Sequence, residues 1–545
     1  MKIIQGQPYP LGMSKIGNIV NFAIEVADDK PCSLLLYRGE EGGLCNSFLM
    51  EKDCGCVQCL AFEDMDTALS SYKYQIGEEV FIDPYAKRMG NLQNDNYDWE
   101  GDKPLHIPYE DVVAYTLHIR GFTMDSYSEV ENKGTFEGVI EKIEYLQELG
   151  INQIQCMPIY EFDNLKEKTN YWGYGPAYYF TPKNSYSAIG DGHVSLKNMV
   201  KALHRAGIEI ILEMPFDVSM PKAMMAECLR YYVSEYHVDG FILNPDITPM
   251  DVVISDAFFK KTKIMKHSTW YKDCMRQFLK GDAGQIGSVI YWLGHISKNE
   301  GIFNYLTSHS GFTLHDLVSY YEKHNEENGD GNRDGVDNNN SWNWGVEGAT
   351  DNEEILALRS RIVKNAYMLL LLSQGTPCLL AGDEFLNSQN GNNNVYCQDN
   401  ETGWLNWENY KKDSSLYEYV KKLIELRKKY KIFHPASEFQ GDDRTNCGIP
   451  DISYHGEEAW MVDMGEENRR LGVFYYSEPD KEEVLYVAYN MHWEDADFAL
   501  PKLPERKHWY LLAETDEGVL EKAKELENQK AIEVKSRTIA VFAGR

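Results

Sequence analysis

Short apolar runs separated by polar turns fill the first part of the chain. Residues 19–24 and 33–37 are two of these runs, and Gly, Asp and Asn residues lie between them and their neighbours. Short strands bounded by turn-forming residues are typical of a β-sandwich. The pattern therefore predicts a small all-β domain over residues 1–105.

From residue 106 the pattern changes to apolar strands that alternate with amphipathic helices. Residues 114–119 and 153–157 indicate strands, and residues 135–149 carry apolar side chains at helical spacing and end at Gly150, a helix-stopping residue. Buried strands that alternate with helices imply a parallel α/β sheet, and a closed (β/α)8 TIM barrel is the commonest large form. We expect the barrel to span residues 106–434.

Short strands return in the last part of the chain. Residues 484–489 and 538–542 are apolar runs of strand length, and they predict a C-terminal all-β domain over residues 435–545. The predicted fold is thus an α/β TIM barrel flanked by an N-terminal β-sandwich and a C-terminal all-β domain. The polar tract at 326–341 is too long for a tight turn and indicates a functional or solvated loop.

Charge and composition narrow the classes of partner. The formal net charge is −31, which argues against nucleic acid and anionic membranes because both require a basic face. No run reaches the roughly 18 apolar residues of a membrane span, and the first residues lack the apolar core of a signal peptide. We therefore expect a cytoplasmic protein without a cofactor, for which a neutral polyol is a compatible ligand.

The cysteines indicate reduced thiols. Their number is eleven, an odd count scattered over a large chain, which does not suit a disulfide framework. Cys54, Cys56 and Cys59 form the one cluster that could hold a metal, and no second Cys or His pair lies nearby. We favour thiols at a strand turn over a zinc site and expect no metal.

Several longer motifs resemble a known enzyme family. They lie at residues 117–123, 170–174, 307–314, 323–329, 379–385 and 391–400. In these motifs the chain resembles glycogen-debranching enzymes of the isoamylase type, which belong to the α-amylase superfamily, glycoside hydrolase family 13. The resemblance covers essentially the whole chain and implies a family-48 carbohydrate-binding-like module before the barrel and a β domain after it.

The resemblance also shows which catalytic groups are changed. Such enzymes cleave α-glucosidic bonds with a carboxylate nucleophile after the fourth strand, a Glu acid after the fifth and a second Asp after the seventh. Here these three positions hold Asn244, His267 and Ser310. An Asn has the shape of Asp but stays neutral, so it cannot act as a nucleophile or base. Ile242 replaces the Arg that orients the nucleophile, and Val218 replaces a His that holds the sugar.

The resemblance also implies a deletion: between Asn244 and the helix that contains Met275, the chain is shorter than the active enzymes of this family, which have a Gly-rich active-site loop there. Each lost catalytic contribution can be worth ~10² to 10⁴ in rate. Asp246, Asp217 and Glu213 are candidate substitutes near the barrel mouth. Cleavage with retention of the anomeric configuration, however, requires two carboxylates about 5 Å apart.

Candidate glucan-binding residues remain at positions that the resemblance implies. Flat rings in the polar loop at 170–174 can stack on sugar faces, and packing in the core is the alternative. For the other candidates, a structural hydrogen-bonding role is the alternative. The candidates are Tyr171, Trp172, Tyr174, His309, Asn394, Tyr396 and Asp399.

Two functions from different classes follow. The first is a catalytically impaired debranching-enzyme-like protein, a pseudoenzyme that binds glycogen or branched maltodextrin or supports an active debranching paralogue as a subunit. The second is an active α-glucan hydrolase for α-1,6 debranching that uses relocated carboxylates. A structural remnant without a ligand is a third alternative. We favour the first, because the substitutions fall at the chemistry while the flanking scaffold motifs remain.

Overall fold

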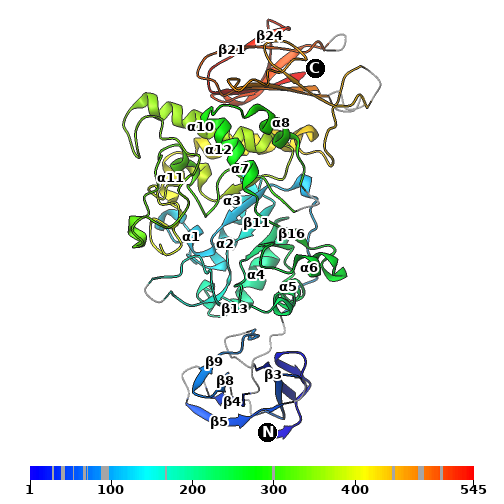
Figure 1. The fold of residues 1–545 in the computed structure, drawn as a ribbon, viewed down its shortest axis with the longest axis vertical. Coiled ribbons are helices and arrows are strands. Elements are labelled where there is room, and N and C mark those ends of the chain that lie inside the picture. Colours follow the sequence, from blue (N-terminus) through cyan, green and yellow to red (C-terminus); the bar gives the residue numbers. More distant parts are fainter. Residues whose placement is uncertain are drawn as a thin grey trace.

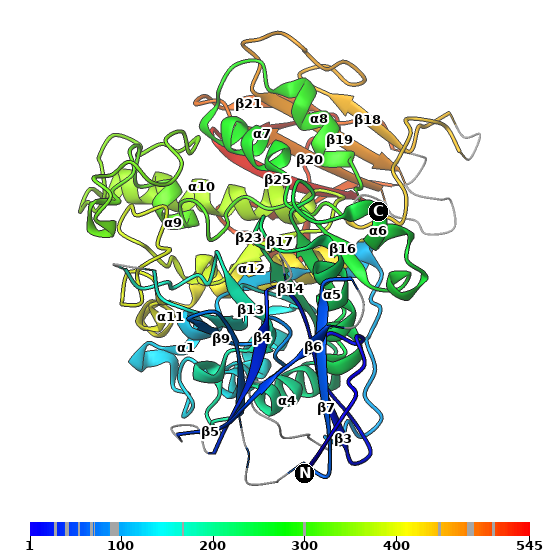
Figure 2. The same cartoon turned by 60° about the horizontal axis from the view of Figure 1, so that its bottom comes forward.

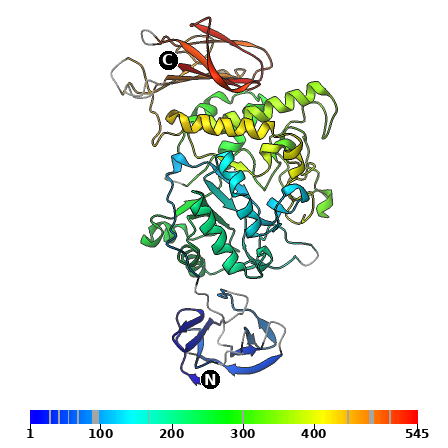
Figure 3. The ribbon, with the colours of Figure 1, turned by 180° about the vertical axis from the view of Figure 1, so that it is seen from behind.

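The computed structural model describes residues 1–26, 30–38, 43–52, 55–65, 69, 71–87, 97–165, 168–297, 301–444, 448–476, 484–503 and 507–545. Three bodies follow one another along its long axis (Figures 1 and 3). A β-rich part lies at the N-terminal end, a barrel of strands and helices lies in the middle, and a second β-rich part lies at the other end. This is the order that the apolar pattern predicted.

The N-terminal part packs two antiparallel sheets against each other. One sheet has the order β1-β7-β3-β2, with β6 also paired to β7, and the other has the order β5-β4-β8-β9. Phe22 and Phe62 of the first sheet pack against Leu34, Leu36 and Tyr72 of the second. The strands are β1 (Lys2–Ile4), β2 (Gly12–Ile16), β3 (Ile19–Glu25), β4 (Cys32–Tyr37), β5 (Leu44–Leu49), β6 (Glu51–Lys52), β7 (Val57–Glu63), β8 (Ser71–Ile76) and β9 (Glu79–Phe81).

The predicted cysteine cluster is covered in part by the structure. Cys54 lies outside the described residues, Cys56 directly precedes β7, and Cys59 is buried within that strand. No group of three His, Cys, Asp or Glu side chains in the described part of the chain could hold a metal ion. The preference for thiols at a strand turn stays a prediction.

Parallel strands form the wall of the barrel. They are β10 (Ala114–Leu117), β11 (Gln153–Cys156), β14 (Glu209–Met214), β15 (Gly240–Leu243), β16 (Lys263–Met265) and β17 (Cys378–Leu380), in the order β16-β15-β14-β11-β10-β17. Two parallel bridges, Lys266 with Ile302 and Asn304 with Pro377, join β16 to β17 and close the ring. The barrel is of the TIM type, and the described residues supply seven of its parallel segments.

Helices cover the outside of this ring. They are α1 (Ile119–Thr123), α2 (Phe136–Glu141), α3 (Ile143–Leu149), α4 (Gly192–Arg205), α5 (Lys222–Tyr236), α6 (Met250–Ser255), α7 (Thr269–Lys280), α8 (Ile286–Gly294), α9 (Leu314–Leu317), α10 (Glu353–Leu372), α11 (Trp407–Lys412) and α12 (Ser415–Lys429). The short 3-10 helices are η2 (Tyr109–Asp111), η3 (Ser126–Ser128), η4 (Asn184–Tyr186), η5 (Ala257–Phe259), η7 (Glu326–Asn328), η8 (Asp383–Phe385) and η9 (Lys431–Phe433). None of the described helices is both long enough and apolar enough to cross a membrane.

The predicted helix at 135–149 is divided into α2 and α3. Thr135 caps the start by accepting a hydrogen bond from the Gly138 amide, and Gly150 ends α3 with φ 96°. Between them the Lys142 amide donates to the carbonyl of Val139, a tighter bond than the α-helical pattern allows. The apolar spacing predicted both ends of this segment but not the break at Lys142.

The C-terminal part is also built of antiparallel sheets. The larger sheet has the order β18-β19-β20-β25-β22-β23, and β21 pairs with β24 in the smaller one. It lies beside α10 and α12 (Figure 1), and Arg537 donates to the carbonyl of Lys280 at the end of α7. The strands are β18 (Ile452–His455), β19 (Arg470–Tyr476), β20 (Val484–Asn490), β21 (Ala496–Ala499), β22 (Trp509–Glu514), β23 (Gly518–Glu525), β24 (Ala531–Val534) and β25 (Thr538–Gly544).

The N-terminal sandwich lies at the barrel end that carries α4, α5 and the hairpin of β12 (Tyr160–Phe162) and β13 (Ala177–Pro182) (Figures 1 and 2). Tyr85 packs on Phe180 of β13, with ring centroids 5.3 Å apart. The hairpin therefore provides part of the surface on which the segment after β9 rests.

Buried charges clamp the chain where it enters the barrel. His204 of α4 lies between two carboxylates, with Nδ1 3.0 Å from Asp102 Oδ1 and Nε2 2.9 Å from Asp239 Oδ2. Asp102 also lies 3.0 Å from His237 Nδ1, and the His237 ring stacks on Trp99 with centroids 4.0 Å apart. Burial lowers the pKa of His204, but the two carboxylates outweigh it and raise that pKa above its ordinary value.

We predict that His204 stabilises the fold in its protonated form. Its contribution is complete below about pH 6.5, the ordinary pKa of His, and is lost as the pH rises through the raised pKa of the folded state. His204→Gln should lower the free energy of unfolding by about 2–4 kcal/mol at pH 6, and the difference from the wild type should shrink toward pH 9. Thermal unfolding at several pH values measures this.

His508→Gln is a matched control, because His508 pairs with Glu525 at an exposed site. Its effect should stay within about 0.5 kcal/mol. A loss in His204→Gln that is equal at pH 6 and pH 9 would contradict the clamp.

Candidate functional site

The predicted site residues follow neighbouring strands of the barrel. Glu213 is the penultimate residue of β14, Asn244 directly follows β15, and His267 lies two residues after β16. His309 and Ser310 follow the bridged segment that contains Ile302 and Asn304. Because the carboxyl ends of parallel strands meet at one rim, these side chains share the mouth of the barrel.

Three predicted residues form a hydrogen-bonded group, which we call the mouth cluster: Glu213, Tyr174 and His309. The Tyr174 hydroxyl donates to Glu213 Oε1 at 2.6 Å and lies 2.7 Å from His309 Nε2. Since the hydroxyl proton is used on Glu213, His309 donates from Nε2 to the Tyr174 oxygen. Nδ1 of His309 is buried and finds no hydrogen-bond partner among the described residues.

Aromatic rings surround the mouth cluster. Trp172 lies edge-on to His309, with centroids 5.0 Å apart, and 5.7 Å from the Tyr174 ring. The ring of His267 lies 6.3 Å from that of His309. Burial lowers the pKa of His309 to about 4, so its imidazole is neutral at pH 7. The cluster therefore offers a neutral ring, a hydroxyl and a carboxyl beside aromatic surfaces.

Burial also acts on the carboxyl of the mouth cluster. It raises the pKa of Glu213 above its ordinary value, although His267 and the Tyr174 hydroxyl oppose the effect. A carboxyl held in this way is poorly hydrated and gains from a ligand that donates hydrogen bonds to it.

Asn244 and Ser310, which stand where the resemblance implies the nucleophile and the stabiliser, carry exposed side chains. Asn244 Oδ1 accepts a hydrogen bond from the Asp246 amide at 2.9 Å, which closes a turn after β15. The carbonyl of Ser310 accepts the hydroxyl of Ser308. Ile242 is buried in the wall of the barrel and Val218 is exposed. Within the described residues, no hydrogen bond joins the side chain of Asn244 or Ser310 to the mouth cluster.

The connection after the fifth strand is very short. β16 ends at Met265 and α7 begins at Thr269, so residues 266–268 form the whole link. Trp270 in the first turn of α7 is 74% exposed. The loss of a loop at this place stays a prediction, and the three-residue link is compatible with it.

The three candidate replacement acids serve different purposes. Glu213 belongs to the mouth cluster. Asp217 accepts hydrogen bonds from the amide and hydroxyl of Ser219, which lower its pKa, and Asp246 is exposed beside Asn244. Within the described residues no hydrogen bond joins any two of these acids.

The remaining candidate residues on the 170–174 loop and beyond are held by neighbours. Tyr171 is buried, and its hydroxyl donates to the carbonyl of Gly403. Arg120 Nε lies 2.8 Å from Asp399 Oδ1, which also accepts from Trp404 Nε1. The motif at 117–123 contained Arg120, but its spacing gave no sign of this pairing.

Tyr396 lies in a polar group that the sequence did not indicate. Its hydroxyl donates to Asp330 Oδ2 at 2.6 Å and accepts from Lys168 Nζ at 2.9 Å. Lys168 also pairs with Asp330 Oδ1 at 2.6 Å. Lys168 stands in no recognised motif, so only its position in space could identify it.

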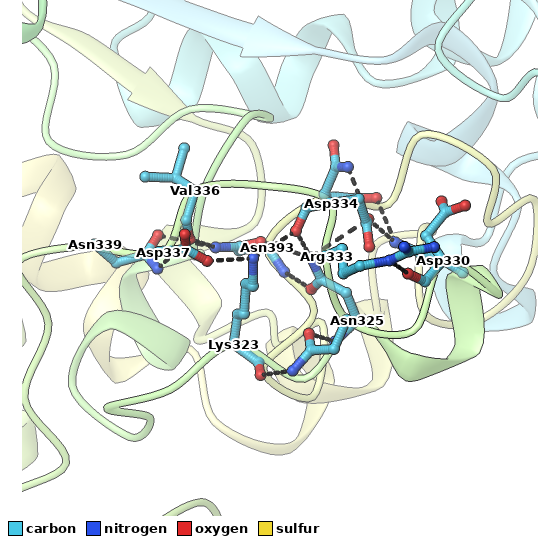
Figure 4. Close-up of polar contacts among 12 residues, drawn as sticks. Lys323, Asn325, Asp330, Arg333, Asp334, Val336, Asp337, Asn339 and Asn393 are labelled. Atoms are coloured by element: carbon cyan, nitrogen blue, oxygen red, sulfur yellow. Dashed lines mark hydrogen bonds and ion pairs between the residues drawn. The ribbon is translucent and has the colours of Figure 1, made fainter.

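The polar tract around residues 326–341 is ordered by amide side chains (Figure 4). Asn325 and Asn393 exchange two hydrogen bonds of 2.9 Å, from Asn325 Nδ2 to Asn393 Oδ1 and from the Asn393 amide to Asn325 Oδ1. Asn394 Nδ2 and Asn328 Nδ2 both donate to Asp334 Oδ2. The tract is therefore a cross-linked loop, and Asn394 is one of its links.

Comparisons with known proteins agree with the fold. The family model described as "Alpha amylase, catalytic domain" matches residues 122–219. The chain is 28% identical to "Isoamylase 3, chloroplastic" of Oryza sativa subsp. japonica, over 94% of this chain and 83% of that protein. It is 29% identical to the "Glycogen operon protein GlgX homolog" of Mycobacterium tuberculosis, over 83% of this chain and 79% of that protein.

Solved structures share the same architecture. A pullulanase from Paenibacillus barengoltzii in complex with maltohexaose and alpha-cyclodextrin gives a TM-score of 0.74 at 20% identity, covering 99% of this chain and 96% of that chain. Pullulanase type I from Bacillus subtilis, complexed with maltose, gives 0.76 at 18% identity, covering 98% of this chain and 85% of that chain. At these identities the likeness concerns the fold, and the predicted TIM barrel with flanking β domains is confirmed.

We predict that Glu213→Gln stabilises the protein at alkaline pH. A raised pKa means that the ionised carboxylate opposes folding, so stability falls as the pH rises from about 4 through the raised pKa of Glu213. Gln keeps the bond from Tyr174 and carries no charge. It should raise the free energy of unfolding at pH 8 by on the order of 1 kcal/mol, with little effect near pH 4.5, as measured by thermal unfolding.

Glu213→Ala distinguishes the effect of the charge from the effect of losing the hydrogen bond. It leaves the Tyr174 hydroxyl without its acceptor and should destabilise the fold at both pH values. If Glu213→Gln were less stable than the wild type at pH 8, the ionised carboxylate of Glu213 would not be opposing folding.

Proposed function

We propose that this chain, which belongs to the glycogen-debranching, isoamylase-like type of the α-amylase superfamily, binds branched α-glucan at its barrel mouth without cleaving it. One observation carries the proposal. The mouth cluster keeps a carboxyl, a hydroxyl and an imidazole beside aromatic rings, while the position of the nucleophile holds Asn244, whose side-chain oxygen is used in a turn.

The chemistry of the mouth suits a sugar. Glucose presents hydroxyl groups around its edge and C–H groups on its faces, so it needs both hydrogen-bonding groups and flat rings. Glu213 can accept hydroxyl protons at its remaining lone pairs, and Nδ1 of neutral His309 can accept one more. Trp172 borders these groups. The names of the relatives, isoamylase and glycogen operon protein, support the same class of ligand.

The catalytic positions lack the carboxyl groups that cleavage requires. A retaining mechanism requires two carboxyls about 5 Å apart on either side of the scissile bond. At the three catalytic positions stand an amide, an imidazole and a hydroxyl. The three-residue link after β16 also leaves out the loop that would frame a bound sugar and exclude water. Supporting an active debranching paralogue as a subunit is compatible with such a protein.

One observation favours the alternative of an active hydrolase. Glu213 has the raised pKa that a general acid requires, and Asp217 has a lowered pKa suited to a base. Asp217, however, is engaged by Ser219 in a turn. We therefore keep α-1,6 hydrolysis with relocated carboxylates as the second candidate.

We expect the purified protein to be retained on immobilised glycogen and to release no reducing ends from glycogen limit dextrin. Tyr174→Ala and His309→Ala should each weaken retention by about tenfold, because each removes a hydrogen-bonding group from the mouth cluster. Affinity electrophoresis in glycogen gels measures retention. Turnover that disappears in Glu213→Gln or Asp217→Asn would establish the alternative.

Restoring the catalytic residues should not restore catalysis. The triple variant Asn244→Asp, His267→Glu and Ser310→Asp has the required carboxyls but still lacks the orienting Arg, at Ile242, and the loop after β16. We expect reducing-end release equal to that of the wild type, with an active isoamylase as positive control. Measurable turnover in the triple variant would mean that the substitutions alone silence the site.

A further inference from the structure

Tyr321 and Trp342 expose a pair of aromatic rings on the loop that follows α9. Tyr321 is 54% exposed and Trp342 is 46% exposed. Their ring centroids lie 5.6 Å apart, and the ring planes are inclined by 81°. The pair forms a corner rather than a flat stack, and none of its ring contacts is part of the mouth cluster.

Glu347 holds the first half of this loop in place. Its carboxylate accepts hydrogen bonds from the amides of Tyr321 at 2.9 Å and Glu322 at 3.1 Å. It also accepts from Asn343 Nδ2 at 2.8 Å and lies 3.2 Å from His324 Nε2. One side chain thus fixes the backbone beneath Tyr321 and the residue next to Trp342.

Arg359 of α10 holds the second half. It is buried, and it donates to the carbonyl of Gly348 at 2.7 Å and to the carbonyl of Asn343 at 2.8 Å. The Trp342 amide donates to the carbonyl of Leu317 in α9. The loop is therefore tied to two helices of the barrel, and the exposed rings are held in one geometry before any ligand arrives.

We propose that Tyr321 and Trp342 form a second binding surface for α-glucan chains, outside the mouth cluster. We call it the Tyr321–Trp342 platform. Two inclined rings can contact successive sugars of an α-linked chain, which turns from one sugar to the next. The class of ligand rests on the function proposed above, and the position of the platform is independent of it.

The surroundings of the platform favour a neutral polyol over a protein or an anion. Glu322, which follows Tyr321 in the chain, provides an exposed carboxylate, and the Glu347–Asn343 pair makes the loop beside Trp342 polar. These groups accept or exchange hydrogen bonds with hydroxyls, and the overall charge of −31 repels anionic polymers. Two rings in a polar rim expose much less apolar surface than a protein interface requires.

The platform also suits branched substrates. It lies in the connection between the bridged segment 302–304 and α10, which also contains His309 and Ser310. Connections that follow barrel strands lie at the mouth end of the barrel. A glucan with several outer chains can occupy both places at once, and two linked sites bind more strongly than either alone. We therefore expect the platform to matter more for glycogen than for a short maltooligosaccharide.

The test compares four forms of the full chain by affinity electrophoresis in gels with glycogen. They are the wild type, the platform variant Tyr321→Ala/Trp342→Ala, the mouth variant Tyr174→Ala/His309→Ala, and the control Trp460→Ala, which removes a 51% exposed Trp from the C-terminal part. The platform variant should bind glycogen about tenfold more weakly than the wild type, and the control should bind like the wild type.

A second measurement guards against misfolding. Titration with maltoheptaose should change the tryptophan fluorescence of the wild type. Trp342→Phe keeps an aromatic ring, so it should melt at the same temperature but lose the part of the fluorescence change that comes from Trp342. If the wild type and the platform variant bind glycogen equally while the mouth variant does not, the platform is refuted and the proposed function stands. If the wild type does not bind glycogen, both are refuted.

Discussion

Closure of the parallel ring between β16 and β17 determines where the side chains of the mouth lie. The segment from Ile302 to Asn304 pairs with Lys266 on one side and with Pro377 on the other. A few residues later the same segment carries His309 to the Tyr174 hydroxyl. Since strands in a closed ring cannot slide independently, the positions of β14, β16 and this segment are set together.

Buried acids beneath the mouth hold the loops that follow the ring. Asp383 accepts the Leu314 amide at 2.8 Å and the hydroxyl of Thr307, and burial raises its pKa to about 7. Glu384 accepts hydroxyls from Tyr115 and Tyr145. The retained motif at 379–385 therefore has a structural reason to persist, whether or not the mouth performs chemistry. A scaffold of this kind can keep its fold while its catalytic residues change.

Polar side chains cross-link the long loops of the rim. Asn325 and Asn393 hydrogen-bond to each other. Glu347 accepts hydrogen bonds from two backbone amides, and Arg359 donates to backbone carbonyls. Each buried donor or acceptor in such a loop would cost free energy if left unpaired. The result is a rim that presents preformed surfaces, among them the mouth cluster and the Tyr321–Trp342 platform.

The sequence by itself determined the order of the three parts, the alternation that makes the barrel, and which residues, namely Asn244, His267 and Ser310, stand where the resemblance implies catalytic groups. These depend on local periodicity and on residue type, which the chain carries directly. It also located Tyr174, His309 and Glu213, but in separate motifs without contacts between them.

Only the tertiary structure decided which of these residues meet. It joined Glu213, Tyr174 and His309 through one hydroxyl, engaged Asp217 and Asn244 in turns, and paired Asp399 with Arg120. Such contacts link residues far apart in the chain, and their geometry follows from how the ring closes. For the same reason, the chain alone could not reveal the brace that holds Tyr321 and Trp342 at the rim.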